Sequence, residues 1–235
     1  MILGHFKEKG FTIIENVFTP EELTLIIDKI LQTNADRPTF RKTNDLFAIR
    51  QFLKEVPEIQ RLIFTTKINN IIAEYFGEDY FVVKSIYFDK PENSNWFVAW
   101  HQDLTISVDK KLDLPGFGPW TIKQDQYAVQ PPLDILENIF TIRIHLDDTD
   151  EKNGALRVIP GSHLSGVQRY SKGPDYEEET CRVKRGGIMI MRPLLQHASN
   201  RTIGSNRRRV IHIEFSNSKL PYGLAWAEML QQHSN

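Results

Sequence analysis

The sequence predicts a mainly β protein, a sandwich or barrel, with helices in its N-terminal part. Up to Gly77 the apolar residues recur at helical spacing, whereas after it they form short runs rich in aromatic and β-branched residues. Glycine and proline turns separate these runs at regular intervals, which is typical of β-sandwiches and barrels. No linker rich in Gly, Ser or Pro divides the 235 residues. We therefore expect a single domain.

Residues 1–77 are predicted to form a mostly helical flank that packs against the outside of a sheet. The clearest helix begins at Thr19, because Thr can cap it, Pro20 fits its first turn and Glu22 completes a capping box. Its apolar residues continue at helical spacing to about Leu31. The rest of the flank is predicted to hold a short strand, a polar loop and a second helical region capped by a glycine, at Phe11–Ile14, Gln32–Asp45, Pro57–Phe76 and Gly77.

The expected strands after Gly77 are short and evenly spaced. Six runs have the composition of strands, at 80–88, 96–100, 140–147, 155–159, 188–191 and 208–215. A long excursion, residues 109–135, is rich in Gly and Pro and predicts an ordered lid or binding loop. Asn153-Gly154 predicts a tight turn of the type that joins hairpin strands. The acidic run 165–180 is predicted to be a solvated loop.

Composition excludes several classes of protein. Lys and Arg number 29 and Asp and Glu 30, so no net positive charge favours nucleic acid or an anionic membrane. A single cysteine, Cys181, excludes an intrachain disulfide framework and fits a reducing compartment. The apolar start is interrupted at once by charged residues, and no apolar run approaches the roughly 18 residues of a membrane span. We expect a cytoplasmic protein, as a monomer or homodimer.

The chemistry is predicted to centre on Trp100-His101-Gln102-Asp103. Side chains two positions apart in extended backbone leave the same face, so His101 and Asp103 can approach one metal ion together. Two histidines and one carboxylate form the facial triad that holds Fe(II), and His197, 94 residues after Asp103, is the best candidate to complete it. In a jelly roll, residues so far apart in sequence can meet inside one barrel. Arg208 follows eleven residues later and offers a cation for a second substrate's carboxylate.

The same three ligands leave two other interpretations open. Two histidines and one carboxylate can also hold zinc or manganese together with a water molecule. A jelly roll with these ligands could equally bind a metal or a small ligand without catalysing a reaction. His-x-Asp alone is a weak motif, and it predicts a metal site only in combination with His197 and Arg208.

These residues, with the run from Asn153 to His163, resemble the phytanoyl-CoA dioxygenase family over about Phe11 to Phe215. The resemblance implies a double-stranded β-helix core, a jelly roll of cupin-like type, with the N-terminal helices packed on its outside. It implies an Fe(II)- and 2-oxoglutarate-dependent dioxygenase that hydroxylates, or otherwise oxidises, a C–H bond of a small organic substrate with O₂, releasing succinate and CO₂. Applied to this chain, it implies a single oxygenase domain, 1–235, with its flank, core, insert and tail at 1–77, 78–217, about 104–138 and 218–235.

By the same resemblance, His101, Asp103 and His197 are the catalytic metal ligands and Arg208 binds the distal carboxylate of 2-oxoglutarate. Ser199 matches a serine that helps to hold the oxo acid. The carboxylate ligand Asp103 favours hydroxylation over halogenation. The family name does not imply a CoA thioester substrate here, because the excursion after Thr105 is longer than in the peroxisomal branch, and the chain shows no peroxisomal address.

Register decides the remaining candidates. Arg143 shares a strand face with Thr141 and His145, and Lys84 shares one with Ile86. If these faces line the barrel, the polar side chains contact the oxo acid or the substrate. If the faces point outward, the same side chains contact water. Among Arg207, Arg208 and Arg209, spacing alone cannot choose. Simple amphipathicity sends the face of Arg208, with His212 and Glu214, to solvent, whereas the family register turns it inward; we follow the family register. His145 and His163 are interpreted as structural histidines, and Trp96, Trp100 and Trp120 as pocket or core residues.

Overall fold

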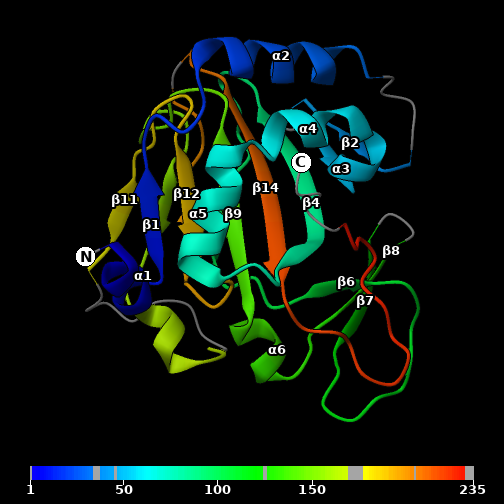
Figure 1. Cartoon of the computed structure of the whole chain (residues 1–235). Coiled ribbons are helices and arrows are strands. Elements are labelled where there is room, and N and C mark those ends of the chain that lie inside the picture. Colours follow the sequence, from blue (N-terminus) through cyan, green and yellow to red (C-terminus); the bar gives the residue numbers. More distant parts are fainter. Residues whose placement is uncertain are drawn as a thin grey trace.

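The computed structural model describes residues 2–33, 38–44, 47–123, 126–168, 177–203 and 205–230. Two antiparallel sheets form its body, a large one of seven strands and a second of four. Helices from the N-terminal part cover one face of the large sheet (Figure 1). This arrangement of antiparallel sheets with helices on one side confirms the predicted mainly β, jelly-roll class with flanking helices.

The seven-stranded sheet combines strands from the whole length of the chain. In spatial order it contains β1 (Phe11–Ile14), β12 (Ile188–Met191), β9 (Ile139–His145), β14 (Arg208–Ser216), β4 (Phe81–Lys90), β3 (Phe47–Arg50) and β2 (Phe40–Lys42). The two longest strands, β4 and β14, pair along nearly their full length at its centre. The sheet therefore brings side chains from the N-terminal and C-terminal parts of the chain together on each of its faces.

The second sheet lies against the other face and holds β11 (Glu179–Cys181), β10 (Leu156–Val158), β13 (His197–Ser199) and β5 (Val98–His101). A third sheet pairs β6 (Ile106–Val108), which precedes the predicted excursion, with β8 (Gln126–Val129) and β7 (Trp120–Lys123), which lie within it. The described part of the excursion is thus ordered, as predicted, but two strands of it belong to an additional sheet. It is followed by the short helix α6 (Leu133–Glu137).

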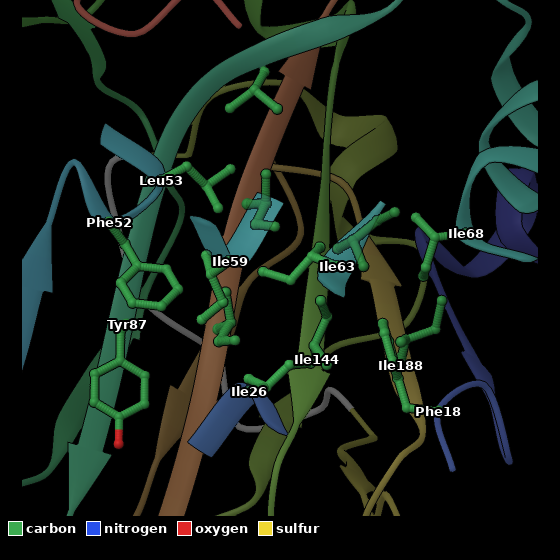
Figure 2. Packing of buried hydrophobic residues seen from close by; sticks show 14 of the residues in the cluster. Phe18, Ile26, Phe52, Leu53, Ile59, Ile63, Ile68, Tyr87, Ile144 and Ile188 are labelled. Atoms are coloured by element: carbon green, nitrogen blue, oxygen red, sulfur yellow. The ribbon is translucent and has the colours of Figure 1, made fainter. Parts of the chain in front are cut away.

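Helices and two 3₁₀ turns complete the fold, at α1 (Ile2–Lys9), α2 (Pro20–Leu31), α3 (Phe52–Glu55), η1 (Pro57–Ile59), α4 (Gln60–Ile63), α5 (Thr66–Phe76) and η2 (Ser162–Ser165). The apolar sides of α2, α4 and α5 pack on the large sheet to form the main core. Figure 2 shows Ile26, Ile59 and Ile63 from the helical side gathered with Ile144 of β9. This side of the large sheet is called the outer face below.

The predicted capping box is confirmed: the Glu22 N–H donates to Thr19 Oγ1 at 3.2 Å and the Thr19 N–H to Glu22 Oε2 at 2.8 Å. The single helical region predicted over 57–76 is wrong in detail, because the chain leaves helical geometry at Phe64 and Thr65. The Ile68 N–H donates to Thr65 Oγ1, which caps a new helix there. That helix ends at Gly77, as predicted.

Other expectations need correction. Part of the predicted loop 32–45 is strand β2, while its residues 34–37 and 45 lie outside the described residues. Asn153-Gly154 does not join hairpin strands: β9 belongs to the seven-stranded sheet and β10 to the four-stranded one, so the turn carries the chain between sheets. The predicted acidic loop 165–180 lies outside the described residues at 169–176, and its last two residues, Glu179 and Thr180, belong to strand β11. The tail beyond residue 230 also lies outside the described residues. Within the described chain, none of the helices has the length and apolar character needed to cross a lipid bilayer.

Candidate metal centre and the cavities beside it

The three predicted ligands meet between the two main sheets. Strands β5 and β13 pair so that His101 and His197 are direct cross-strand partners, with ring centroids 4.2 Å apart. Asp103 faces both rings: its Oδ1 lies 3.8 Å from His101 Nε2 and its Oδ2 3.7 Å from His197 Nε2. One potential ligand atom from each residue falls within 4.8 Å of the others. These residues could hold one metal ion.

Backbone carbonyls set the tautomers of both histidines. His101 Nδ1 lies 2.8 Å from the carbonyl oxygen of Ala99, and His197 Nδ1 lies 2.9 Å from that of Leu195. A carbonyl oxygen can only accept, so each Nδ1 carries the proton and donates it. Each Nε2 then has a free lone pair directed toward the Asp103 carboxylate. This is how second-shell hydrogen bonds orient metal-ligating imidazoles.

Asp103 itself lies just beyond strand β5, which ends at His101. The backbone stays held, because the Asp103 N–H donates to the carbonyl oxygen of Pro193 at 2.8 Å. Gln102, between the two ligands, turns the other way and donates to the carbonyl oxygens of Leu194 and Gly166 at 2.6 and 2.9 Å. His101 and Asp103 therefore still point to one side and Gln102 to the other, although Asp103 does not pair within a sheet.

Electrostatics favour the protonation states that a metal needs. Burial disfavours ionisation of Asp103, but His197, His212 and Lys84 outweigh it and hold the pKa of this carboxyl well below its usual range. Burial lowers the pKa of His197 to about 4, an effect that Asp103 only partly opposes. Near neutral pH the pair is thus a carboxylate and a neutral imidazole, both competent ligands.

A cavity of about 180 Å³ opens on this cluster and brings together all seven residues singled out from the sequence. Called the first cavity below, it is lined by Lys84, His101, Asp103, Arg143, His197, Ser199 and Arg208, together with Ile86, Phe88, Trp96, Val98, Leu156 and His212. Of the three tryptophans considered, Trp96 is the one that lines it. Trp100 instead contacts the Arg157 guanidinium at 5.2 Å, and Trp120 packs with the core of the third sheet.

The three adjacent arginines have different surroundings. Arg207 pairs with Asp89, and Arg209 pairs with Asp147 through Nε at 2.9 Å and Nη2 at 2.6 Å. Arg208 is buried in the first cavity and has no carboxylate partner among the described residues. Its Nη1 donates to the carbonyl oxygen of Gly154 and lies 3.5 Å from Ser199 Oγ, while its Nε has no partner.

Further positive groups surround Arg208. Burial and the neighbouring Arg143 lower the pKa of Arg208 to about 9, and burial lowers that of Arg143 to about 10. Lys90, which donates to the carbonyl oxygen of Asn200, has its pKa lowered to about 7 by burial and by Arg208. Clustered, desolvated cations without anionic partners are costly unless an anion joins them. This end of the cavity is suited to a carboxylate.

The face of Arg208 lies inward, as the family register implies, and it carries a chain of hydrogen bonds that the sequence did not reveal. Arg143 Nη1 donates to His212 Nδ1 at 3.1 Å, His212 Nε2 donates to Glu214 Oε1 at 3.1 Å, and Glu214 Oε1 accepts from Lys84 Nζ at 2.6 Å. Simple amphipathicity had directed His212 and Glu214 to solvent, yet both are buried. Glu214 neutralises Lys84, and His212 holds the Arg143 guanidinium.

The structural histidines lie away from the metal cluster. His145 is buried with Nδ1 2.8 Å from Thr149 Oγ1, and its pKa is well below the usual range because of burial, Arg143 and Arg208. His163 lies outside the first cavity, with Nε2 3.1 Å from the carbonyl oxygen of Lys7. Cys181 is buried, and burial raises its pKa to about 12, so it is an inert thiol.

A second cavity, of about 160 Å³, adjoins the first and shares Lys84, Ile86 and Asp103 with it. The remaining residues that line it are Arg50, Thr105, Ser107, Gln126 and Ala128. Arg50 was not predicted as a site residue, because it ends a strand of four residues whose sequence shows no clear alternation. The third sheet, through β6 and β8, therefore helps to wall the space next to Asp103.

The chain resembles known proteins along most of its length. The family described as Phytanoyl-CoA dioxygenase (PhyH) matches residues 6–210. A probable alpha-ketoglutarate-dependent hypophosphite dioxygenase of Stutzerimonas stutzeri is 26% identical over 177 residues, 69% of this chain and 52% of that protein. The ectoine dioxygenase of Bordetella bronchiseptica is 21% identical over 192 residues, 78% of this chain and 56% of that protein. The chain thus spans about half the length of the curated relatives it matches.

Solved structures agree on the fold. EctD from S. alaskensis in its apo form aligns with a TM-score of 0.72 at 18% identity, covering 97% of this chain and 85% of that one. At this identity the likeness establishes the architecture, with its two facing sheets.

Proposed function

Because this chain belongs to the phytanoyl-CoA dioxygenase family, we propose that it is an Fe(II)- and 2-oxoglutarate-dependent dioxygenase acting on a C–H bond of a small organic substrate. One observation carries the proposal: two imidazole Nε2 atoms and a carboxylate converge in the same cavity as a buried arginine, Arg208, that has no anionic partner within the part of the chain that the structure describes. The first set suits ferrous iron, and the second suits the oxo acid. The curated relatives' names give different substrates, so no substrate is transferred from them.

His101, Asp103 and His197 would hold the iron. The residues present fit this role, because the donor set is two neutral imidazoles and one carboxylate whose free lone pairs face one another. Bound there with 2-oxoglutarate, the ion supplies the O₂ activation that oxidises a C–H bond and releases succinate and CO₂. The chain's own contribution is to fix the ligands through the carbonyl oxygens of Ala99 and Leu195 and to keep Asp103 ionised.

Arg208 and Ser199 would hold the distal carboxylate of 2-oxoglutarate. Arg207 and Arg209 pair with Asp89 and Asp147, whereas Arg208 pairs with no carboxylate of the described ranges, and the Ser199 hydroxyl lies beside it. Arg143 and Lys84 would contact the cosubstrate less directly. Arg143 adds positive charge to the cavity, whereas Lys84, whose charge is paired with Glu214, offers N–H donors. Burial excludes water from this region, so each charged contact to the oxo acid would be stronger than at a surface.

The test is succinate release from 2-oxoglutarate by protein supplied with Fe(II), O₂ and a panel of small molecules. Arg208→Gln should raise the KM for 2-oxoglutarate by roughly tenfold to hundredfold, because it removes a charge-assisted contact. Arg207→Gln is the matched control: it removes a neighbouring guanidinium that pairs with Asp89 and should leave this KM unchanged. Tight binding of Fe(II) and 2-oxoglutarate without O₂ consumption under every condition would instead favour a binding protein.

Localisation and assembly stay predictions. We propose a cytoplasmic enzyme with a small-molecule substrate, acting as a monomer or homodimer and without nucleic-acid or membrane partners. The single-domain organisation, with residues 1–77 as flank and 104–138 as insert, is proposed in the same way. The near-neutral charge of the chain supports the lack of nucleic-acid partners.

A further inference from the structure

The second cavity, like the first, is lined by the carboxylate of Asp103, but most of its other lining residues are different. Its lining combines Asp103, Lys84 and Arg50 with the neutral polar side chains of Thr105, Ser107 and Gln126. Arg208 and Ser199, which we assign to the oxo acid, do not line it. The space is therefore adjacent to the metal ligands and separate from the end of the first cavity where 2-oxoglutarate would be anchored.

Arg50 is directed into this space by strand register. It pairs with Ile86 between β3 and β4, and cross-strand partners project from the same face of a sheet. Ile86 lines both cavities, so Arg50 projects from the inner face as well. Arg50 ends its strand because Gln51 follows in left-handed geometry, with φ of 51°. The guanidinium is thus placed at the rim of the sheet, beside the two cavities.

The charge on Arg50 has no anionic partner among the described residues. Its backbone N–H donates to the carbonyl oxygen of Thr39, while its half-buried side chain makes no hydrogen bond or ion pair with the described chain. Burial, and then the positive charge of Arg41, lower its pKa, and no carboxylate opposes either effect. A desolvated guanidinium of this kind gains most from a bidentate oxyanion.

The other charges that face the cavity are already engaged. Lys84 pairs with buried Glu214 at 2.6 Å. Asp103 faces the imidazoles of His101 and His197 and would be shared with the metal ion. The unmatched charge of the cavity is therefore positive and belongs to Arg50. Neutral hydroxyl and amide groups from Ser107, Thr105 and Gln126 complete a wall that can donate hydrogen bonds.

We propose that the second cavity binds the anionic group of the primary substrate, a carboxylate or a comparable oxyanion, through Arg50. The inference rests on the proposed function and narrows its substrate class to small organic acids. At about 160 Å³ the cavity is compact, and the apolar side chains of Ile86, Phe88 and Trp96 in the adjoining first cavity offer a surface for the carbon skeleton. Anchored at Arg50, the acid would present a neighbouring carbon toward the open side of the metal site.

The test measures binding rather than turnover. The protein is loaded with Zn(II) and 2-oxoglutarate, so that the Arg208 end is filled, and titrated with isobutyrate and with isobutyramide, which have the same shape but differ in charge. A second pair, benzoate and benzamide, extends the panel, and propylphosphonate separates oxyanions in general from carboxylates. Ligand-observed saturation-transfer NMR gives the dissociation constants. The acids should bind more tightly than the amides by roughly tenfold or more.

Arg50→Gln should abolish this preference, and Arg50→Lys should keep part of it, because lysine retains the charge without the bidentate geometry. Arg41→Gln, a neighbouring exposed arginine, is the matched control and should retain the full preference. Calorimetry should find equal unfolding temperatures, since Arg50 has no partner in the described chain to lose. Acids that bind no better than amides, or a preference that survives Arg50→Gln or disappears only with Arg208→Gln, would overturn the proposal.

This outcome is distinguishable from failure of the proposed function. A preference for acids that depends on Arg50, in a protein that never releases succinate, would refute the oxygenase and leave the anion site standing. Succinate release coupled to neutral substrates, with an unchanged KM in Arg50→Gln, would refute the anion site and leave the oxygenase standing.

Discussion

The two faces of the seven-stranded sheet have the same degree of burial but opposite chemistry. Along β14, Ile211, Ile213 and Phe215 enter the outer core beneath the helices. The alternate residues Arg208, His212 and Glu214 are also buried, yet they face the cavities and the second sheet. In β9 likewise, Ile142 and Ile144 pack outward, whereas Arg143 lines the first cavity.

The difference shows that alternation of apolar and polar residues along a strand indicates two different environments, but does not indicate that the polar side faces water. On the outer face the buried side chains are mainly apolar, and they stabilise the folded state through the apolar area removed from solvent. On the inner face the burial of polar groups costs desolvation free energy. Pairs such as Lys84 with Glu214 offset part of this cost, and bound ligands would offset more. We expect substitutions on the inner face to change chemistry and those on the outer face to change stability.

The largest expected effect comes from an inner-face ligand. His197→Ala should reduce succinate release by more than about a hundredfold, because losing a direct ligand should exceed the 10–100-fold typical of outer-shell changes. Bound iron, measured by mass spectrometry of the purified protein, should fall in parallel, while the unfolding temperature of the metal-free protein changes little. His5→Ala, at an exposed position, is the control. Full iron occupancy in His197→Ala would contradict the assigned site.

On the outer face, Ile144→Ala should lower the free energy of unfolding by about 2–5 kcal/mol through lost burial and a cavity. Ile144 is fully buried and adjoins Arg143, which faces the other way. Urea unfolding measures the loss, and succinate release per folded molecule should be retained. A variant of normal stability with reduced turnover would show that the two faces are not independent.

Glu228 tests a polar group placed on the outer side. It accepts from Ser85 Oγ at 2.7 Å, and burial raises its pKa to about 7. Since the folded state holds this proton more tightly than the unfolded state, the associated stability is complete below about pH 4.5 and is lost as pH rises through 7. Glu228→Gln should therefore stabilise the protein at pH 8 by up to about 3 kcal/mol and flatten this pH dependence.

Chemical unfolding at pH 4.5 and pH 8 measures the effect of Glu228→Gln. The exposed Glu78→Gln serves as the control and should change neither value. Equal stabilities of the wild type and Glu228→Gln at pH 8 would mean that the carboxyl ionises without penalty, and would contradict a pKa raised by burial.

The smallest effect is expected at Arg209, on the outer side of β14. Arg209→Gln should cost about 0.5–1 kcal/mol of stability, because it removes a partly exposed ion pair with Asp147. The KM for 2-oxoglutarate should stay at the wild-type value. An increase in this KM comparable to that of Arg208→Gln would place the wrong arginine at the oxo acid and shift the register by one residue.

The sequence was sufficient where a local signal has one physical meaning. The capping box at Thr19, the strand at 188–191 and the glycine at the end of α5 follow from short-range geometry. The triad could be found because His-x-Asp fixes two ligands on one side of an extended segment. The imidazole of His197 then needed only cross-strand pairing to join them.

Other features depend on tertiary context. The helix break at Thr65 competes with a continuous apolar stripe, and the sequence does not reveal that the hydroxyl would cap a new helix. The family register turned His212 and Glu214 inward, but their pairing depends on Lys84, which is 130 residues from Glu214. Arg50 enters its cavity only because β3 happens to pair with β4. None of these relations has a signature within one window of sequence.

The amide of Gln102 has a consequence for how the site is loaded. With the Asp103 N–H it ties the segment of two ligands to the carbonyl oxygens of Pro193 and Leu194, just ahead of the third ligand. The two halves of the centre are therefore cross-linked by the chain itself, whether or not an ion bridges them. We expect ion uptake and exchange to proceed at rates set by diffusion into the cavity and water release, with little rearrangement of the backbone.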